Sequence, residues 1–330
     1  MNTSAGLSSM QDFSEFVLDL YQLSRETPLH EFQDVALSQV KQVLAFDSAM
    51  WGTATATPQG IDVHTLHLHK QPPEMLHAYT QIKHLDTAAQ QVGTQSRSTL
   101  GFSVADWFAA PEQAPLRAHG QSFEQANFFI TSQVNLNTQF AHWLTLFRAK
   151  DAHVCTEAEL KVLAALSPHV MQALSFNRMA HLARLEQSGL PFRGRAVSDL
   201  RGTLYHADAS FEALVRTEWA TWRSNSSLPH SLLQHFESGH ARHIGQRAVF
   251  SQKRERDLLF MSARKRSRAD ALSERESVVA RLVAQGNTYK EIARALGRSP
   301  ATIRNQIQAI YHKLEVGSIA SLIEALRETE

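Results

Sequence analysis

LSERESVVARLVAQGNTYKEIARALGRSPATIRNQIQAIYHKLEVGSIASL, residues 272–322, is the stretch with the clearest structural punctuation in the chain. It contains two capping boxes and two glycines that suit the end of a helix: Ser273 with Glu276, Thr288 with Glu291, Gly286 and Gly297. Ser299 is a good N-cap, and Pro300 suits the first position of the helix that follows. These signals predict four helices: Ser273 to Gly286, Thr288 to Leu296, Pro300 to Leu314 and Ile319 to Arg327.

The third of these predicted helices separates its apolar and polar residues cleanly. Its apolar side chains fall within about 60° of one another at 100° per residue: Ile303, Ile307, Ile310 and Leu314. The opposite face carries small and polar residues: Ala301, Asn305, Gln308 and His312, with Arg304 on the flank. Only a short turn with a glycine precedes this helix, which is the helix-turn-helix arrangement. Asn and Gln pair with adenine edges and Arg with guanine edges, so this face suits DNA. The alternative is a solvated amphipathic helix.

Charge is distributed unevenly along a chain whose net charge is only +1. Residues 1–180 hold 10 Lys and Arg against 16 Asp and Glu, a net charge of −6. Residues 181–330 hold 23 against 16, a net charge of +7, which favours contact between this half and a polyanion. Residues 270–330 balance eight basic against eight acidic residues. The positive charge is therefore concentrated in residues 286–314, with five basic residues against one acid, and in the run before the first helix.

The same segment resembles the LuxR-type output domain of bacterial regulators. That domain has an L-T-x-R-E opening, a G-x-x-N-K-E-I-A second helix, a T-V-K recognition helix and a K-L-G-V end. The matching residues here are 272–276, 286–293, 302–304 and 313–316, without a gap. Three residues depart from the pattern, since Tyr289 replaces the usual Asn, Gln306 a frequent His and Glu315 the usual Gly.

The resemblance implies roles for individual residues. Arg304, Asn305 and Gln308 occupy the positions that contact base edges. Phosphate contacts, which position the domain without reading sequence, are expected from Thr288, Lys290, Arg298, Thr302 and His312. The resemblance also implies a homodimer on double-stranded DNA, an activator that works with RNA polymerase, and an all-α domain over residues 272–330.

The N-terminal half is predicted to be α+β with an antiparallel sheet. Asp12 to Leu44 has helical spacing, and three segments are strand-like: Phe46 to Thr53, Ile61 to His69 and Phe140 to Arg148, the last a central strand. Thr156 and Glu159 form a capping box before a long helix to Glu186. Residues 1–186 thus resemble a GAF-like sensor with a long exit helix, which either pairs with a second subunit or caps the sheet.

A chain of 330 residues has room for two or three domains. Residues 192–262 resemble a short PAS-like module, with a strand–turn–strand at Arg195 to Tyr205, a helix at Phe211 to Trp219, and two later strands. The alternative is an extension of the first domain. Residues 263–271, which include the basic run Arg264 to Arg268, are interpreted as a linker, solvated or touching phosphates.

The signal that the N-terminal half senses is expected to be a hydrophobic or aromatic small molecule. The aromatic residues expected to line its pocket are Trp51, Trp107, Phe128, Phe129 and Trp143, with ordinary core as the alternative for each. A second hypothesis is an acyl-homoserine-lactone sensor, because residues 79–108, with Asp86 and Trp107, are faintly similar to that family. Control by partner proteins, or an enzyme domain fused to the DNA-binding domain, are the remaining alternatives.

Several classes of protein and site are not expected. A response-regulator receiver needs acidic residues at strand ends, which the first 130 residues lack, and a sigma-like protein needs a basic melting helix upstream. The chain has no apolar run of about 18 residues, no secretory leader and no nucleotide or nucleophile motif, so we expect a cytoplasmic non-enzyme without cofactor or membrane contact. His64, His67 and His69 are interpreted as a chance cluster rather than a metal site. The single Cys155 excludes a disulfide framework, and its place at a helix start leaves a redox role open.

Overall fold

The computed structural model describes residues 9–57, 60–92, 96–135, 140–186, 194–223 and 227–327. The chain divides into two compact units, Met1–Ala183 and Arg184–Glu330, and each is considered by itself below. The first two residues of the predicted 192–262 module and the last three of the 272–330 domain lie outside the described residues. No helix in the described ranges has the length and hydropathy needed to span a bilayer.

The first unit is built on a five-stranded antiparallel sheet of order β2-β1-β5-β4-β3. Its strands are β1 Ser48–Thr57, β2 Gly60–His69, β3 Arg97–Ser103, β4 Asn127–Asn135 and β5 Phe140–Arg148. The expected antiparallel sheet is confirmed, and β5 is its middle strand as predicted. Two of the strands, β3 and β4, were not predicted.

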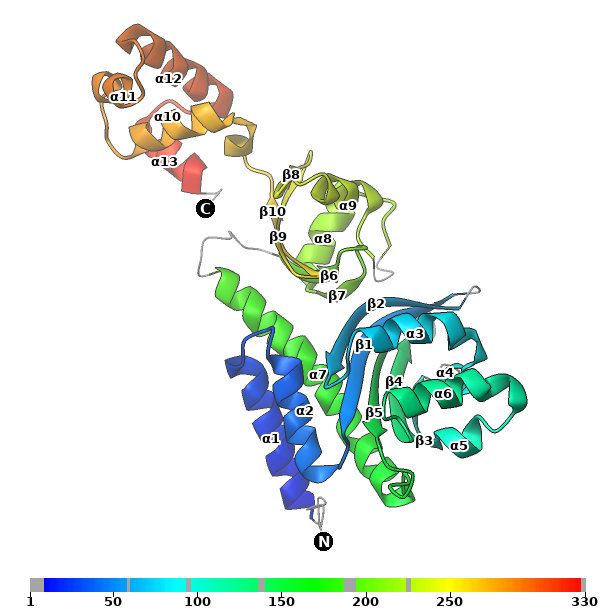
Figure 1. Cartoon of the computed structure of the whole chain (residues 1–330). Coiled ribbons are helices and arrows are strands. Elements are labelled where there is room, and N and C mark those ends of the chain that lie inside the picture. The colour runs from blue at the N-terminus through cyan, green and yellow to red at the C-terminus, as the bar shows by residue number, and fades with distance from the viewer. Residues whose placement is uncertain are drawn as a thin grey trace. The chain divides into compact units, whose positions relative to one another are not determined.

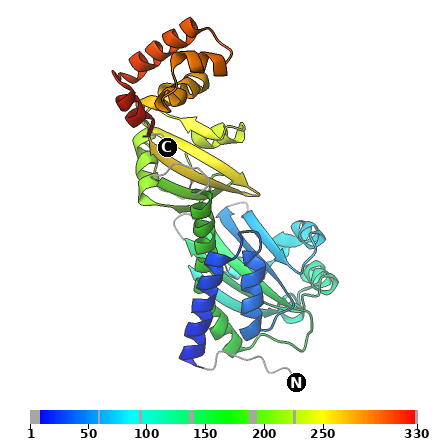
Figure 2. The same cartoon turned by 90° about the vertical axis from the view of Figure 1, so that its left-hand side faces the viewer.

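Helices cover both faces of this sheet, as Figure 1 and Figure 2 show. The helices of this unit are α1 Met10–Glu26, α2 Phe32–Val43, α3 Glu74–Ile82, α4 Thr87–Val92, α5 Val104–Trp107, α6 Ala114–Ser122 and α7 Glu157–Glu186, with 3-10 turns η1 Lys83–Leu85 and η2 Pro111–Gln113. On one face, α1, α2 and α7 pack on a core that includes Trp51, Phe129 and Leu144. On the other face, α3 to α6 enclose a second core rich in aromatic side chains, including Phe102, Phe108 and Phe128.

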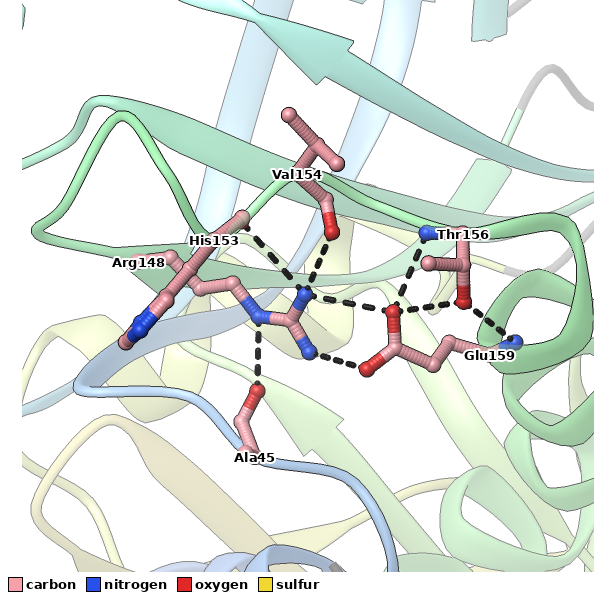
Figure 3. A network of polar contacts seen from close by, with 6 residues as sticks. All are labelled: Ala45, Arg148, His153, Val154, Thr156 and Glu159. Atoms are coloured by element: carbon pink, nitrogen blue, oxygen red, sulfur yellow. Dashed lines mark hydrogen bonds and ion pairs between the residues drawn. The ribbon is translucent and has the colours of Figure 1, made fainter. Parts of the chain in front are cut away.

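A buried arginine fixes the junction between β5 and α7 (Figure 3). Arg148 is 5% exposed and donates from Nε to the carbonyl of Ala45 at 2.9 Å and from Nη1 to that of Val154 at 2.9 Å. Its Nη2 pairs with Oε1 of Glu159 at 2.5 Å. Glu159 also accepts from the backbone N–H and hydroxyl of Thr156, so the predicted capping box is present and linked to the sheet. One side chain therefore holds three chain segments together.

The second unit begins with another antiparallel five-stranded sheet, of order β7-β6-β10-β9-β8. Its elements are β6 Gly194–Asp199, β7 Leu204–Ala207, α8 Ala209–Glu218, α9 His230–Glu237, β8 Arg242–Ile244, β9 Ala248–Glu255 and β10 Leu258–Lys265. The strand–turn–strand, helix and two later strands lie where the sequence predicted them. Helices α8 and α9 pack on one face around Phe211, Phe236 and Phe250.

Four helices complete the chain, and they confirm the predicted all-α region. They are α10 Glu274–Ala284, α11 Tyr289–Ala295, α12 Pro300–Leu314 and α13 Ile319–Arg327. Both capping boxes are formed, and Ser299 caps α12 through the backbone N–H of Thr302. Gly286 has φ +88° and Gly297 has φ +61°, which is the left-handed conformation that made glycine a stop signal.

The basic run at 264–268 differs from the solvated linker that the sequence indicated. Strand β10 continues to Lys265, and a 3-10 turn, η3 Arg268–Ala271, follows after two residues. Arg264 is 5% exposed because its guanidinium forms two bonds to the Asp270 carboxylate, at 2.6 and 2.5 Å. Arg266 donates to the carbonyl of Gly245 at 3.1 Å. Arg268 pairs with Glu315 at 2.7 Å, so three of the four basic side chains are bonded within the unit, which their spacing alone did not show.

Candidate functional site

The third helix of the C-terminal region, α12, presents the predicted polar face to solvent. The residues of its apolar stripe that are buried are Ile303, Ile310 and Leu314, which pack on α10 and α11. The three predicted base-contacting residues are all exposed: Arg304, Asn305 and Gln308. The fold therefore leaves donors and acceptors of all three side chains open to a partner on one side of the helix.

The predicted phosphate-contacting residues fall into two groups. Lys290, Arg298 and His312 are exposed, and no ion pair engages Lys290 or Arg298 within the described part of the chain. The two threonines instead bond within the first turns of their helices, because Thr288 is the N-cap of α11 and Thr302 is the third residue of α12, whose N-cap is Ser299. The Thr288 hydroxyl donates to Glu291 at 2.8 Å, and the Thr302 hydroxyl lies 2.8 Å from that of Ser299. Both hydroxyls therefore already take part in hydrogen bonds within the domain, and both residues are exposed at the starts of α11 and α12.

Beside the apolar packing, a cation–π contact and an ion pair link α12 to α11 and α10. The Cζ atom of Arg304 lies 4.7 Å from the ring centroid of Tyr289, the first residue of α11. Lys313 Nζ lies 2.9 Å from Oε2 of Glu276, the capping-box acid of α10. The hydrogen bond from Lys313 and the backbone N–H of Ser273 lower the pKa of Glu276 to about 2. The cap of α10 and the packing of α12 are thus coupled through one carboxylate.

The five aromatic residues proposed for a sensor pocket do not gather at one place. In the antiparallel register Trp51 lies opposite Leu144 and Gly52 lies opposite Trp143, so the two tryptophans point to opposite faces. Trp51 and Phe129 belong to the core under α1, α2 and α7. Phe128 lies on the other face, where Trp107 packs edge-on against Phe102 with ring centroids 4.8 Å apart. Three of the five thus share the face covered by α3 to α6.

A polar group of side chains accompanies this aromatic face. The Tyr79 hydroxyl donates to Asp86 at 2.6 Å, and Asp86 also accepts from the backbone N–H groups of Ala88 and Ala89. Burial and the Asp86 carboxylate raise the pKa of Tyr79. Trp107 Nε1 donates to the Thr87 hydroxyl at 3.0 Å. Asp86 and Trp107, which the sequence linked to a lactone sensor, therefore lie close together, because Trp107 bonds to the residue that follows Asp86.

The clustered histidines have structural partners, and Cys155 is a half-buried free thiol. His67 and His69 both contact Oδ1 of Asp34, at 3.0 and 2.7 Å, and His64 contacts the Thr55 hydroxyl at 2.8 Å. Among the described residues, no group of three or more His, Cys, Asp or Glu side chains is placed to hold a metal ion. Burial raises the pKa of the Cys155 thiol to about 11 despite the opposing charge of Arg148. The thiolate that a redox sensor needs is therefore disfavoured.

Comparison with known families settles the nature of the C-terminal helices. Residues 270–326 match the family model described as bacterial regulatory proteins, luxR family. These residues form a LuxR-family domain. The match begins at Asp270, so it includes the last two residues of the η3 turn as well as the four helices. No curated protein sequence matches the chain at a significant level.

Solved structures with some likeness to the chain include bacterial transcription factors and a GAF domain. One is the N-acylhomoserine lactone-dependent factor CepR2 of Burkholderia cenocepacia, with 17% identity and TM-score 0.40 over 52% of this chain and 98% of that one. Another is Escherichia coli SdiA, with 14% identity and TM-score 0.37 over 96% of this chain and 97% of that one. A phycoerythrobilin-bound GAF domain of a cyanobacterial phytochrome has 10% identity and TM-score 0.35 over 51% and 96%. All three scores are below 0.5.

Two features of the LuxR-family domain escaped the sequence analysis. Tyr289 was visible only as a departure from the family pattern, yet its ring lies against a predicted base-contacting residue. Asp270 was assigned to a linker, yet its carboxylate also accepts from the backbone N–H of Ser267 and pairs with Arg242. Ala269 and Leu272 beside it belong to the core of the domain. A signal was available, since Ser267 and Asp270 have the three-residue spacing of a capping pair.

Proposed function

We propose that this chain is a sequence-specific DNA-binding transcription regulator in which α12 enters the major groove. The proposal is carried by the LuxR-family match over residues 270–326, in which the polar face of α12 is free of the core. Arg304, Asn305 and Gln308 then contact base edges, with Arg304 suited to a guanine and the two amides to adenines. Lys290, Arg298 and His312, with the hydroxyls of Thr288 and Thr302, contact phosphates and set the register of the helix.

The domain is proposed to bind as a homodimer and to activate transcription with RNA polymerase. Two copies place their recognition helices about 34 Å apart, which is one turn of DNA, so the preferred site is an inverted repeat. Residues 1–186 serve as the sensor in this proposal, and residues 192–262 form a PAS-like module between sensor and output. The alternative hypothesis is an enzyme domain fused to a DNA-binding domain.

Replacing Arg304 tests the base-contacting role. Arg304→Ala is expected to weaken binding by about 1–3 kcal/mol at sites selected by the full-length protein from random duplexes, because a bidentate contact to guanine is lost. Binding to unselected duplex should change little. Arg254→Ala removes an exposed arginine from β9 and serves as the matched control for lost charge. Equal losses on selected and unselected DNA contradict base contact by Arg304, and fluorescence anisotropy at fixed salt measures both.

The signal is proposed to be a hydrophobic small molecule that binds between the sheet of the first unit and helices α3 to α6. This face combines aromatic side chains with the polar set of Tyr79, Asp86 and Trp107, and the pockets that bind small molecules have this mixed character. The same observation supports a ligand with an apolar chain and a polar head, which is the acyl-homoserine-lactone class. A ligand present at 100 times its Kd is expected to stabilise the first unit by about 2.7 kcal/mol.

Thermal unfolding against a metabolite panel that includes acyl lactones tests the sensor. Two conservative tryptophan variants locate the site, because Trp107 lies on the α3-to-α6 face and Trp51 lies on the other. Trp107→Phe should reduce the ligand-induced shift, whereas Trp51→Phe should keep it when each variant is compared with its own ligand-free baseline. A panel without any shift contradicts small-molecule sensing. A shift that both variants reduce equally contradicts the location.

A further inference from the structure

We propose that Tyr289 is a specificity-determining residue that positions Arg304 for base recognition. The inference rests on the proposed function, in which α12 enters the major groove. It concerns a residue of α11, and it assigns to the tyrosine a role in deciding which base pair the domain prefers.

The geometry places the two side chains on different helices and in direct contact. The Arg304 guanidinium carbon lies 4.7 Å from the Tyr289 ring centroid, within the range of a cation–π interaction. Tyr289 is half-buried against the C-terminal core, whereas Arg304 is exposed. The N-cap Thr288 and its partner Glu291 fix the backbone on both sides of the ring. The ring is therefore the rigid member of the pair and the arginine the adjustable one.

A stacked guanidinium keeps its hydrogen-bonding edge. The ring contacts the guanidinium near its central carbon, whereas the N–H donors lie in the plane of the group and point away from that carbon. Guanine presents O6 and N7 along one edge in the major groove and accepts two of these donors side by side. A guanidinium held by a ring loses less freedom when it forms that pair than one moving in water. The benefit of Tyr289 should therefore appear only where Arg304 meets a guanine.

The LuxR-type pattern usually has asparagine at position 289, where this chain has tyrosine. An asparagine has no aromatic ring and cannot stack on the arginine in this way. In this chain the tyrosine replaces it while the adjacent Lys290, Glu291 and Ile292 keep the family pattern. The substitution is thus local to the contact with Arg304, and the backbone around it forms the same capped helix.

A double-mutant cycle on the full-length protein tests the proposal. Wild type, Tyr289→Leu, Arg304→Ala and the double variant are compared on a selected site and on the same site with the Arg304-dependent guanine pair replaced. Tyr289→Leu keeps apolar bulk against the core, and it should weaken binding to the selected site about two- to fivefold. It should have no further effect once Arg304 is alanine. Tyr289→Phe retains the ring and should conserve most of the discrimination.

The outcomes separate this inference from the proposed function. If Tyr289→Leu weakens binding equally with and without Arg304, the tyrosine acts through packing and the inference is overturned. If Tyr289→Phe loses as much as Tyr289→Leu, the hydroxyl is the active group, which also overturns positioning by the ring. If the wild-type protein enriches no DNA site, the proposed function is contradicted, and the inference that rests on it is contradicted as well. If the protein selects a site normally but the effects of the Tyr289 and Arg304 substitutions are independent, only the inference is contradicted.

Discussion

Arg148→Met is expected to lower the free energy of unfolding of the first unit by about 3–5 kcal/mol, which is the usual cost of breaking a buried ion pair by removing one partner. The methionine retains an apolar stem of similar length but donates no hydrogen bond. The carbonyl oxygens of Ala45 and Val154 lose their donor, and Glu159 loses its counter-charge (Figure 3). Unfolding in urea, monitored by hydrogen exchange of peptides from residues 140–186, measures the loss of stability at the junction between β5 and α7.

Two comparisons make the Arg148 result specific. Arg97→Met removes an exposed arginine from β3 and should change stability by less than about 0.5 kcal/mol. Arg148→Lys keeps the charge but not the planar fork, so its loss should be intermediate. An Arg148→Met protein as stable as the Arg97→Met protein contradicts the role of this network.

The pH dependence of the same pair has a definite sign. Burial acts to raise the pKa of Glu159, but its bonds to Arg148 and Thr156 outweigh burial, so the pKa is lowered from 4.5. A carboxylate whose pKa is lowered by folding stabilises the folded protein. This contribution is complete when the pH is above the pKa of the unfolded chain, and it is lost as the pH falls through the lowered pKa of the folded state. The difference between wild type and Arg148→Met should therefore be largest above about pH 5 and narrow in acid.

Asp270→Ala is the second substitution with a large expected effect, again about 3–5 kcal/mol, and this loss lies in the second unit. The Asp270 side chain is 1% exposed and accepts from both terminal nitrogens of Arg264, whose side chain is 6% exposed. Alanine leaves the Arg264 guanidinium buried without its counter-charge. Since the turn η3 carries Ala269 and Leu272 into the core of the LuxR-family domain, the loss should also loosen the start of that domain.

A matched carboxylate controls for the charge change at position 270. Asp257 lies in the exposed turn between β9 and β10, so Asp257→Ala should leave stability nearly unchanged. Hydrogen exchange of peptides covering residues 258–284 should be faster in Asp270→Ala and unaltered in Asp257→Ala. Identical exchange in both variants means that Asp270 does not hold β10 and η3 together.

Local signals in the sequence were enough to predict the C-terminal helices. The predicted helices from Pro300 to Leu314 and from Ile319 to Arg327 match α12 and α13 because caps and stops depend on neighbouring residues alone. Strand β4 gave no such signal, since nearly all its residues are buried and apolar residues do not alternate along it. Helices α3 to α6 have at most nine residues each and present too few turns for a helical period to show.

The candidate site was predictable where it depends on one helix and not where it depends on packing. The exposed positions of Arg304, Asn305 and Gln308 follow from the spacing along α12. The contact between Tyr289 and Arg304 depends on the distance between two helices, which the periodicity of one helix does not determine. Likewise, Trp51 and Trp143 could be assigned to opposite faces only once the pairing register of β1 and β5 was known.

Selection of DNA from a random duplex library by the full-length protein tests the central claim most directly. The account predicts an enriched inverted repeat containing a guanine whose replacement by 7-deazaguanine, which removes the N7 acceptor, weakens the binding of wild type but not of Arg304→Ala. Enrichment of no sequence above the starting library, with binding that depends only on salt, would contradict it.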